Sequence, residues 1–460
     1  MRQLFLVSFF SIIGLLFSAQ AGDNIPGLTG DLQGMRSKLL KKGFHFGLAY
    51  TGEIYSNLSG GFRQQATYLD IINFRLKIDL GRTLNWHGAT LYTDYLGIHG
   101  DDPSENVGDI QGVSNIAAPK GWKFHEAWFR QNVFSDKLSL LWGMYDLNTE
   151  FDLIETAGLF LNSSHGMGPD FSQGEIFSPS TFPATTFGMR IKTALTSSLS
   201  LQAGITDGVP GDLDKPWQMQ ISGDEGALIV IEITHLLDKR KIEIPGARSK
   251  SKKGRGRGKG LRRWRKMRGN FPNCRWNRHL SSRPRPLDIC PGKVAIGGWF
   301  YTTKFEEWRT SNETDLPLHQ KVNWGVYLLT ERIIYRPKIC MEQGILMYGR
   351  AGIADKSSNQ FDIYLGGGIV THGIMFGRPD DLAGIAIAAL HSSPQYRDYQ
   401  KLEGNDLLDW EVALEFTYRS KLTDWAVLQH DMQYIINPGM NPGLMVVQKY
   451  NDTPKTVVMI

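Results

Sequence analysis

Apolar and polar residues alternate with period two over many short segments of this chain. Between positions 72 and 80 every even-numbered residue is apolar and every odd-numbered residue is polar or charged, Arg75 among them. Since successive side chains of a strand point to opposite faces, such a segment has one apolar and one charged face. The same alternation marks residues 185–192 and 410–419, and weaker copies occur at 44–55, 89–95, 124–130, 138–145, 199–205, 228–233, 294–304, 324–330, 345–349 and 361–369.

Strands of this pattern occur in soluble sandwiches and in transmembrane barrels, and two further features favour the barrel. Aromatic residues such as Tyr55, Tyr95 and Trp142 stand at segment ends, as at the two interfaces of a membrane. Short connections at 135–137, 196–198 and 421–424 contrast with long ones at 97–121, 150–183 and 207–226. We therefore predict an all-β fold, a transmembrane antiparallel β-barrel of about 16 strands with short periplasmic turns and long extracellular loops.

The first residues indicate export. Arg2 precedes an apolar run and an Ala-Gln-Ala site at 19–21, which predicts a signal peptide over residues 1–21. Residues 22–43 form an N-terminal segment with a short predicted helix, because Leu32, Met35 and Leu39 have helical spacing and Gly43 can end it. The barrel then covers 44–460. Beyond the signal peptide no apolar run approaches the roughly 18 residues that a membrane-spanning helix needs.

Charge divides the chain into two unlike parts. Residues Lys239 to Arg285 contain 19 Lys or Arg and one acidic residue, which leaves 32 basic and 45 acidic residues elsewhere. The block at 239–290 has neither alternation nor an apolar stripe, so we expect a solvated insertion. Two interpretations stay open: a loop that touches anionic lipid headgroups, or an aberrant segment from a shifted reading frame. Nucleic-acid binding is disfavoured because an exported protein does not meet nucleic acid.

The C-terminal residues 445–460 are atypical for a last barrel strand. Pro454 cannot donate to a strand ladder, and the chain ends without an aromatic residue. The sequence therefore leaves open whether the final strand closes the barrel and whether the barrel-assembly machinery recognises it.

No motif of an enzyme or of a metal site is present. The chain has no G-x-S-x-G, no H-E-x-x-H and no complete P-loop, and its three cysteines lack metal-binding spacing. Carboxylate pairs such as Asp101 and Asp102 stand in expected loops, where solvated charges are more common than a glycosidase pair. We therefore expect no catalysis, no cofactor and no metal, and keep a barrel enzyme only as a remote alternative.

Several separate motifs, in order, resemble the carbohydrate-selective outer-membrane porins of Gram-negative bacteria, the OprB family. They are Leu28–Arg36, Lys42–Glu53, Ser104–Ile116, His125–Trp128, Gly143–Asp146, Ser163–Asp170 and Pro291–Tyr301, and the likeness covers residues 28–240 and 291–443. The basic block departs from the acidic, Gly-rich loop of relatives, and residues 445–460 depart from their aromatic-ended last strand.

This resemblance implies passive, selective diffusion of carbohydrates, glucose-like mono- or oligosaccharides, across the outer membrane. The implied partners are neutral sugars, outer-membrane lipid and lipopolysaccharide, and no nucleic acid. A monomer and a homo-oligomer are both compatible with the sequence. A general diffusion porin is the alternative function.

Strand phase predicts which wall residues face the lumen. If the apolar even positions of 72–80 face lipid, Arg75 points inward. A lipid-facing Arg near the midplane would cost about 2 to 4 kcal/mol, so Arg130 also points inward and brings its face of 124–130 with it. The predicted pore-lining wall residues are therefore Arg75, Asp94, Glu126, Trp128 and Arg130. The alternative is that these charges pair across the wall and only stiffen the barrel.

A long loop folded into the bore is the expected constriction, and residues 150–183 are the candidate. Polar residues of this loop offer hydrogen bonds to sugar hydroxyls, and those predicted to line the pore are Asn162, His165 and Asp170. Each of them has an equally weighted alternative role, which is to hold the loop against the barrel wall.

Overall fold

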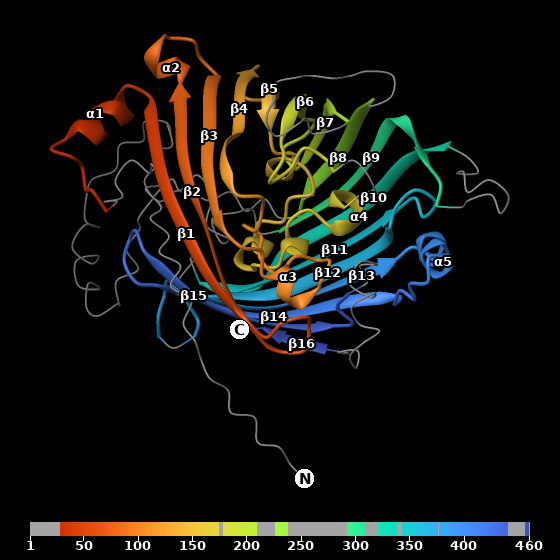
Figure 1. Ribbon diagram of the computed structural model, residues 1–460. Coiled ribbons are helices and arrows are strands. Elements are labelled where there is room, and N and C mark those ends of the chain that lie inside the picture. The colour runs from red at the N-terminus through yellow and green to blue at the C-terminus, as the bar shows by residue number, and fades with distance from the viewer. Residues whose placement is uncertain are drawn as a thin grey trace, which may run out of the picture.

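The fold is a closed antiparallel β-barrel, shown in Figure 1. The structure, a computed structural model, describes residues 28–173, 178–208, 226–237, 292–308, 320–337, 343–375, 377–439 and 456–459. Within these residues each strand pairs with its neighbours in sequence, and β16 returns to β1. The 16 strands described are β1 (Phe44–Ser59), β2 (Ala66–Asp79), β3 (Ala89–Gly100), β4 (Gly121–Val133), β5 (Leu138–Tyr145), β6 (Thr186–Ala194), β7 (Leu199–Asp207), β8 (Ala227–Leu236), β9 (Gly292–Glu306), β10 (Gln320–Tyr335), β11 (Gly344–Ala354), β12 (Phe361–His372), β13 (Leu382–Ser392), β14 (Trp410–Lys421), β15 (Val427–Ile436) and β16 (Thr456–Met459).

The strands have an outward and an inward face of different character, as the alternation predicted. In β2, Phe74 points outward with 46% of its surface exposed, whereas its neighbour Asn73 points inward and is buried. Many exposed outward positions of the other strands are also apolar, as Ile385 and Ile387 of β13 illustrate. An apolar outer face and a polar inner face are what a barrel in lipid requires. The all-β prediction is therefore confirmed.

The helices are few and short. Those described are α1 (Met35–Lys41), α2 (Leu80–Thr83), α3 (Ser104–Val107), α4 (Pro169–Ser172) and α5 (Pro394–Leu402), with 3-10 turns η1 (Leu147–Thr149), η2 (Thr156–Leu159) and η3 (Ser163–His165). Helix α1 lies where the sequence predicted one, and Gly43 follows it at φ +93°, a left-handed conformation that favours glycine. None of the helices in the described ranges has the length and apolar character that a membrane crossing needs.

Connections of different length gather at opposite ends of the barrel. Because neighbouring strands are antiparallel, the short β4–β5, β6–β7 and β14–β15 turns share one end, and the long β3–β4 and β5–β6 loops share the other. By the same rule, the facing ends of β8 and β9 belong to the short-turn end. The basic block at 239–290 and the predicted signal peptide at 1–21 lie outside the described residues.

The last described strand closes the barrel although it lacks an aromatic end. Met459 pairs with Asn57 of β1 and with Gln433 of β15, and Thr456 pairs with Ile436. Strand pairing uses backbone groups, so it does not require an aromatic side chain. Of the two questions that the sequence left open, this four-residue pairing answers whether the final strand closes the barrel. Pro454 lies outside the described residues.

Deleting Lys241–Arg285 is expected to leave the barrel intact. Strands β8 and β9 already meet at the ends that flank this segment, since Leu236 pairs with Lys293 and the Leu237 N–H donates to the Gly292 carbonyl at 2.9 Å. A turn of a few residues is enough to join such a hairpin. The heat-modifiable band on a gel and the glucose flux of the variant should match those of the full chain.

A deletion of similar kind inside a strand provides the control. Removing 229–233 from β8 breaks the ladder with both β7 and β9, and the folded band should then disappear. Loss of the folded band after deletion of 241–285 as well would show that the basic segment is structural.

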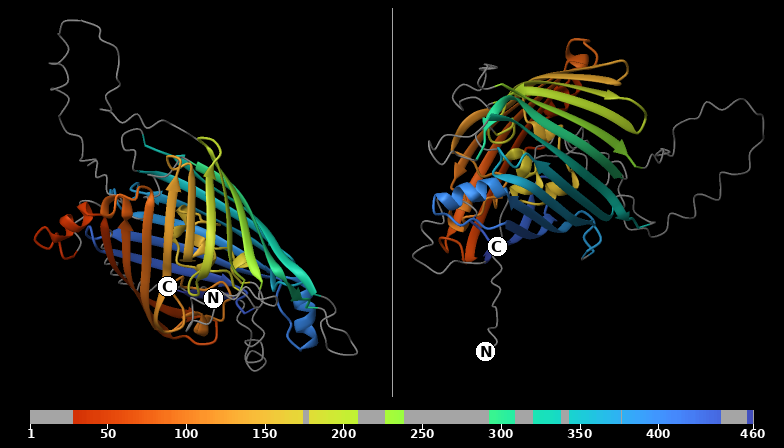
Figure 2. Two further views of the ribbon diagram at one scale, coloured as in Figure 1. Left: turned by 90° about the horizontal axis from the view of Figure 1, so that it is seen from above. Right: turned by 90° about the vertical axis from the view of Figure 1, so that its right-hand side faces the viewer.

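Two long loops enter the barrel: the β5–β6 loop, drawn in gold in the interior of Figures 1 and 2, and the β3–β4 loop, drawn in orange with α3 in Figure 1. The β5–β6 loop carries buried aromatic side chains that pack on the inner wall: Phe171 stacks on Trp299 of β9 at 5.0 Å, and Phe160 lies 5.9 Å from Tyr348 of β11. These loop rings and the inward aromatic side chains of β9 and β11 form a hydrophobic core inside the barrel. The prediction that the loop at 150–183 folds into the bore is confirmed by these contacts.

Candidate functional site

The five wall residues predicted from strand phase lie together on the inner face of β2, β3 and β4. Arg75 pairs in register with Asp94, and Asp94 with Glu126. Tyr92 pairs with Trp128, and Arg130, two residues further along β4, pairs with Thr90. We call the inward side chains Arg75, Tyr92, Asp94, Glu126, Trp128 and Arg130 the β2–β4 wall.

Polar and aromatic contacts link these side chains. The Arg75 Nε donates to Asp94 Oδ2 at 3.2 Å, and Asn73 Nδ2 donates to the same carboxylate. The Trp128 Nε1 donates to Glu126 Oε1 at 3.1 Å. Rings of Tyr92 and Trp128 stack with centroids 4.9 Å apart. These contacts hold each side chain in one orientation.

A β-bulge between Asp94 and Tyr95 aims Glu126 into the lumen. The register shifts there, so that Asp94 faces Glu126 while Tyr95 faces Phe124. Phe124 and Glu126 would share a face in a regular strand, yet Phe124 is exposed on the outer surface and Glu126 is buried inside. Bulges commonly redirect a side chain in this way. The extra residue, His125, lies with its Nε2 3.4 Å from Asp146 at the start of the β5–β6 loop.

The three predicted loop residues, Asn162, His165 and Asp170, are buried and contact side chains of β11, β14 and β15. The Asn162 N–H donates to Glu415 Oε2 at 3.1 Å, and its Nδ2 donates to Gln433 Oε1 at 3.1 Å. The Tyr348 hydroxyl lies 3.0 Å from His165 Nδ1. Burial lowers the pKa of His165 to about 3, so its ring is neutral at pH 7 and its 3.7 Å approach to Glu415 is no ion pair.

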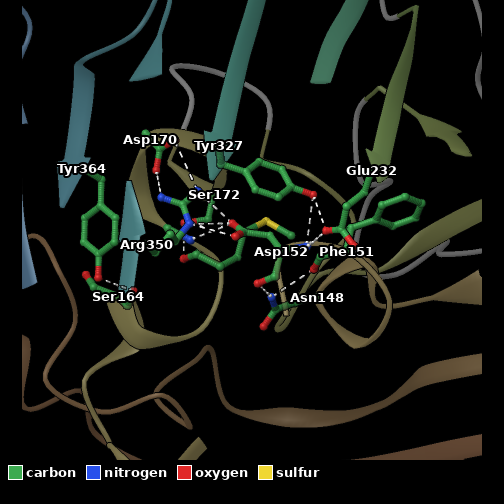
Figure 3. A network of polar contacts seen from close by, with 12 residues as sticks. Asn148, Phe151, Asp152, Ser164, Asp170, Ser172, Glu232, Tyr327, Arg350 and Tyr364 are labelled. Carbon is green, nitrogen blue, oxygen red and sulfur yellow. Dashed lines mark hydrogen bonds and ion pairs between the residues drawn. The ribbon is translucent and has the colours of Figure 1, made fainter. Parts of the chain in front are cut away.

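Asp170 belongs to a clamp around Arg350 of β11, shown in Figure 3. The Arg350 Nε and Nη2 donate to Asp152 at 2.8 to 3.0 Å, and both terminal nitrogens donate to Asp170. The guanidinium also lies 5.5 Å from the ring centre of Tyr327 and 5.2 Å from that of Tyr364. Paired carboxylates with two rings satisfy a buried guanidinium on every side.

Two glycines leave the space that the clamp occupies. A Cβ on Gly168 would lie 2.0 Å from the Arg350 guanidinium, and a Cβ on Gly352 would lie 2.1 Å from the Asp170 carboxylate. Both contacts are shorter than any real packing distance. Alanine at either position would therefore push the clamp apart without changing its charge.

Glutamates on the inner face of the barrel accept hydrogen bonds from backbone N–H groups at several points along the β5–β6 loop. Glu232 of β8 accepts from Asp152 at 3.0 Å, and Glu331 of β10 accepts from Thr156 at 3.0 Å. Glu415 of β14 accepts from Leu161 at 2.6 Å. Together with Arg350, these bonds fasten residues 146–173, which we call the constriction loop, to strands β8 to β15.

The β2–β4 wall lies on the other side of the bore. In the ring of strands β3 and β11 are eight positions apart in either direction, so the wall faces the strand that carries Arg350. Part of the wall stays accessible, since 34% of the Arg75 side chain is exposed and Trp128 and Arg130 are half-buried, whereas Asp94 and Glu126 are buried behind them. The side chain of Arg130 lies 5.1 Å from the ring centre of Trp128. This wall therefore offers aromatic faces and charged groups to a solute.

Sequence reasoning missed Arg350 and Asp152. The strand around Arg350 alternates only weakly, because its inward residues Leu346 and Tyr348 are as apolar as its outward ones. A single Arg with Gly349 directly before it and Gly352 two residues after it was the signal available. Among the described residues no cluster of three or more His, Cys, Asp or Glu side chains is arranged to hold a metal ion.

Comparisons with known proteins agree with this architecture. A family model described as carbohydrate-selective porin, OprB family, matches residues 63–458. Porin B of Pseudomonas aeruginosa is 24% identical over 472 residues, covering 93% of this chain and 91% of that protein. The high-pH structure of Pseudomonas putida OprB has a TM-score of 0.73 at 20% identity and covers 94% of this chain and 96% of that one. The low-pH structure of the same protein has a TM-score of 0.52 at 18% identity, with 94% and 95% covered.

Proposed function

The chain belongs to the carbohydrate-selective porin, OprB family, and we propose that neutral sugars cross it along the β2–β4 wall, between this wall and the constriction loop. Membership makes the protein an outer-membrane channel for carbohydrates and not an enzyme. The route is the proposed part. The observation that carries it is the stacked pair Tyr92 and Trp128 with Arg130 and Glu126 beside it, on the wall that the loop leaves partly exposed.

The chemistry of this wall suits a neutral sugar. The C–H face of a pyranose packs on an aromatic ring, and Trp128 supplies the largest one here. Sugar hydroxyl groups accept from the partly exposed Arg75 and Arg130, and bonds that involve a charged group are the stronger kind. The buried Asp94 and Glu126 hold Arg75 and Trp128 in place for these contacts. Such contacts replace the water that the sugar sheds on entry, while their small number keeps the sugar free to leave.

The constriction loop completes the proposed passage by filling the opposite side of the bore. Asn162, His165 and Asp170 take part in this through the contacts that fasten the loop, so we assign them the role of shaping the passage. A loop held by buried charged and polar bonds keeps a fixed distance from the β2–β4 wall. Fixed spacing is what selection among solutes by size and shape requires.

The outer surface supports a further part of the proposal, contact with outer-membrane lipid. Outward side chains such as Phe46, Ile54 and Phe74 are about half exposed and apolar. Rings of Trp122, Tyr95 and Phe124 form an outward aromatic group near the end of β4 where the long loops lie. Aromatic groups of this kind sit at the membrane–water interface of barrels, here on the side of the lipopolysaccharide leaflet.

Liposome flux tests the proposed selectivity. Purified full-length protein in liposomes is expected to pass glucose faster than gluconate, an anion of similar size, because the neutral sugar forms hydrogen bonds and stacking contacts with the β2–β4 wall. Liposome swelling in isotonic glucose or gluconate measures both rates, and empty liposomes give the leak. Equal rates would assign the protein to general diffusion.

A further inference from the structure

The two loops that enter the barrel share one strand as their anchor. Glu411 of β14 accepts N–H groups of the β3–β4 loop, from Ile110 at 3.0 Å and from Gln111 at 3.1 Å. Four residues along the same strand, Glu415 accepts from Leu161 and Asn162 of the constriction loop at 2.6 and 3.1 Å. Both glutamates face inward and have no exposed surface.

The two loops also form backbone hydrogen bonds directly with one another. The Asn115 N–H donates to the Leu161 carbonyl at 2.8 Å, and the Ser163 N–H donates to the Gly112 carbonyl at 2.8 Å. On the neighbouring strand, Gln433 bridges both loops, since its Nε2 donates to the Val113 carbonyl at 2.8 Å and its Oε1 accepts from Asn162. A displacement of one loop therefore strains bonds made by the other.

A buried carboxyl group that accepts two backbone N–H groups holds them strongly. Inside the protein no water replaces a lost acceptor, so leaving these buried N–H groups without one is costly. The glutamates therefore act on the backbone of the loops and impose a position that does not depend on the loop side chains. The rest of each loop is connected to this point by the bonds between the loops.

We propose that Glu411 and Glu415 are positioning residues that hold the β3–β4 loop and the constriction loop as one body, and so fix the width of the passage beside the β2–β4 wall. This step rests on the proposed function only where sugar is the solute. The coupling between the loops is a property of the fold and can be measured without sugar.

Hydrogen–deuterium exchange in the full-length protein tests the coupling. Glu411→Gln keeps the side-chain shape but replaces one of the two acceptor oxygens by an N–H₂ group, so the N–H groups of Ile110, Gln111 and Gly439 compete for a single oxygen. Amides of 108–113 should then exchange about tenfold faster, as for the loss of about 1.4 kcal/mol. Amides of 157–165 should also exchange faster, although Glu411 makes no hydrogen bond to that segment in the described structure. Acceleration confined to 108–113, or absent from both segments, would overturn the proposal.

Single-channel recording in planar bilayers tests the width of the passage. Glu415→Gln should raise the conductance about twofold and admit polyethylene glycols of larger size than the parent channel admits, an effect that a purely stabilising role would not produce. Thr417→Val is the matched control, because Thr417 lies on the same inward face of β14. Its Oγ1 donates to the His430 carbonyl and accepts from Gln429 Nε2, both on β15. The control should keep the parent conductance and size limit.

The outcomes separate this proposal from the proposed function. Unchanged conductance and size limit in folded Glu415→Gln would refute the positioning role even if glucose is selected. Conversely, coupled exchange with a widened channel, in a protein that passes glucose and gluconate equally, would refute sugar selection and leave the positioning role standing. If Glu415→Gln gives no heat-modifiable barrel, Glu411→Gln decides by the same two measurements.

Discussion

Replacing Arg350 with methionine should release the constriction loop from β11 and destabilise the barrel by about 3 to 5 kcal/mol, the usual cost of removing one partner from a buried ion pair. Asp152 and Asp170 would remain as buried carboxylates without their cation, and both are less than 2% exposed. They gain solvent only if the loop moves away from the wall. Unfolding by urea in detergent micelles measures the loss of stability, and an increased, noisier single-channel conductance reports the loop movement.

Two further variants separate charge from packing in this prediction. Adding Asp152→Asn and Asp170→Asn to Arg350→Met removes the whole charged set, and most of the lost stability should return because no buried charge is then left unpaired. Gly168→Ala retains every charge but places a methyl group within 2.0 Å of the guanidinium, so it should loosen the loop as well. A folded Arg350→Met barrel with parent stability and conductance would show that the clamp is not needed.

Side-chain alternation predicted the wall of the pore better than its loops, for a physical reason. On β2 the inward face stays partly exposed at Arg75, so polar residues alternate with apolar outward ones and the period of two is plain. On β11 and β13 the loops cover the inward face. Leu346 and Ala388 are accordingly apolar and buried, although they point into the barrel. A strand that is apolar on both faces has no visible alternation, which explains the weak pattern at 345–349.

The clamp and the loop anchors lay beyond sequence reasoning because they join distant positions. Asp152 and Arg350 are 198 residues apart, and Ile110 and Glu411 are 301 apart. Their meeting depends on how the loops enter the barrel, which no local pattern encodes. The bulge at Asp94 is a local feature, yet it too was hidden, because His125 and Glu126 read as ordinary members of one alternating strand.

Replacing Trp128 with alanine should weaken sugar binding in the lumen about tenfold, which corresponds to about 1.4 kcal/mol and falls near the upper end of what one aromatic contact contributes. The ring stacks on Tyr92 and lies beside Arg130, so its removal takes away the flat surface and leaves the guanidinium with no ring beneath it. Titrating maltose or glucose against the ion current in planar bilayers gives the half-blocking concentration, which should rise by this factor.

Trp122→Ala provides the matched control for Trp128→Ala, because both residues lie on β4 but Trp122 points outward and is 49% exposed. Its loss should leave the half-blocking concentration unchanged, since an outward ring meets lipid and no permeating solute. Trp128→Phe keeps an aromatic face without the Nε1 donor to Glu126, so it should recover most of the lost affinity. If Trp128→Ala and Trp122→Ala give the same half-blocking concentration as the parent, sugars do not travel along the β2–β4 wall, and its charges serve only to brace neighbouring strands.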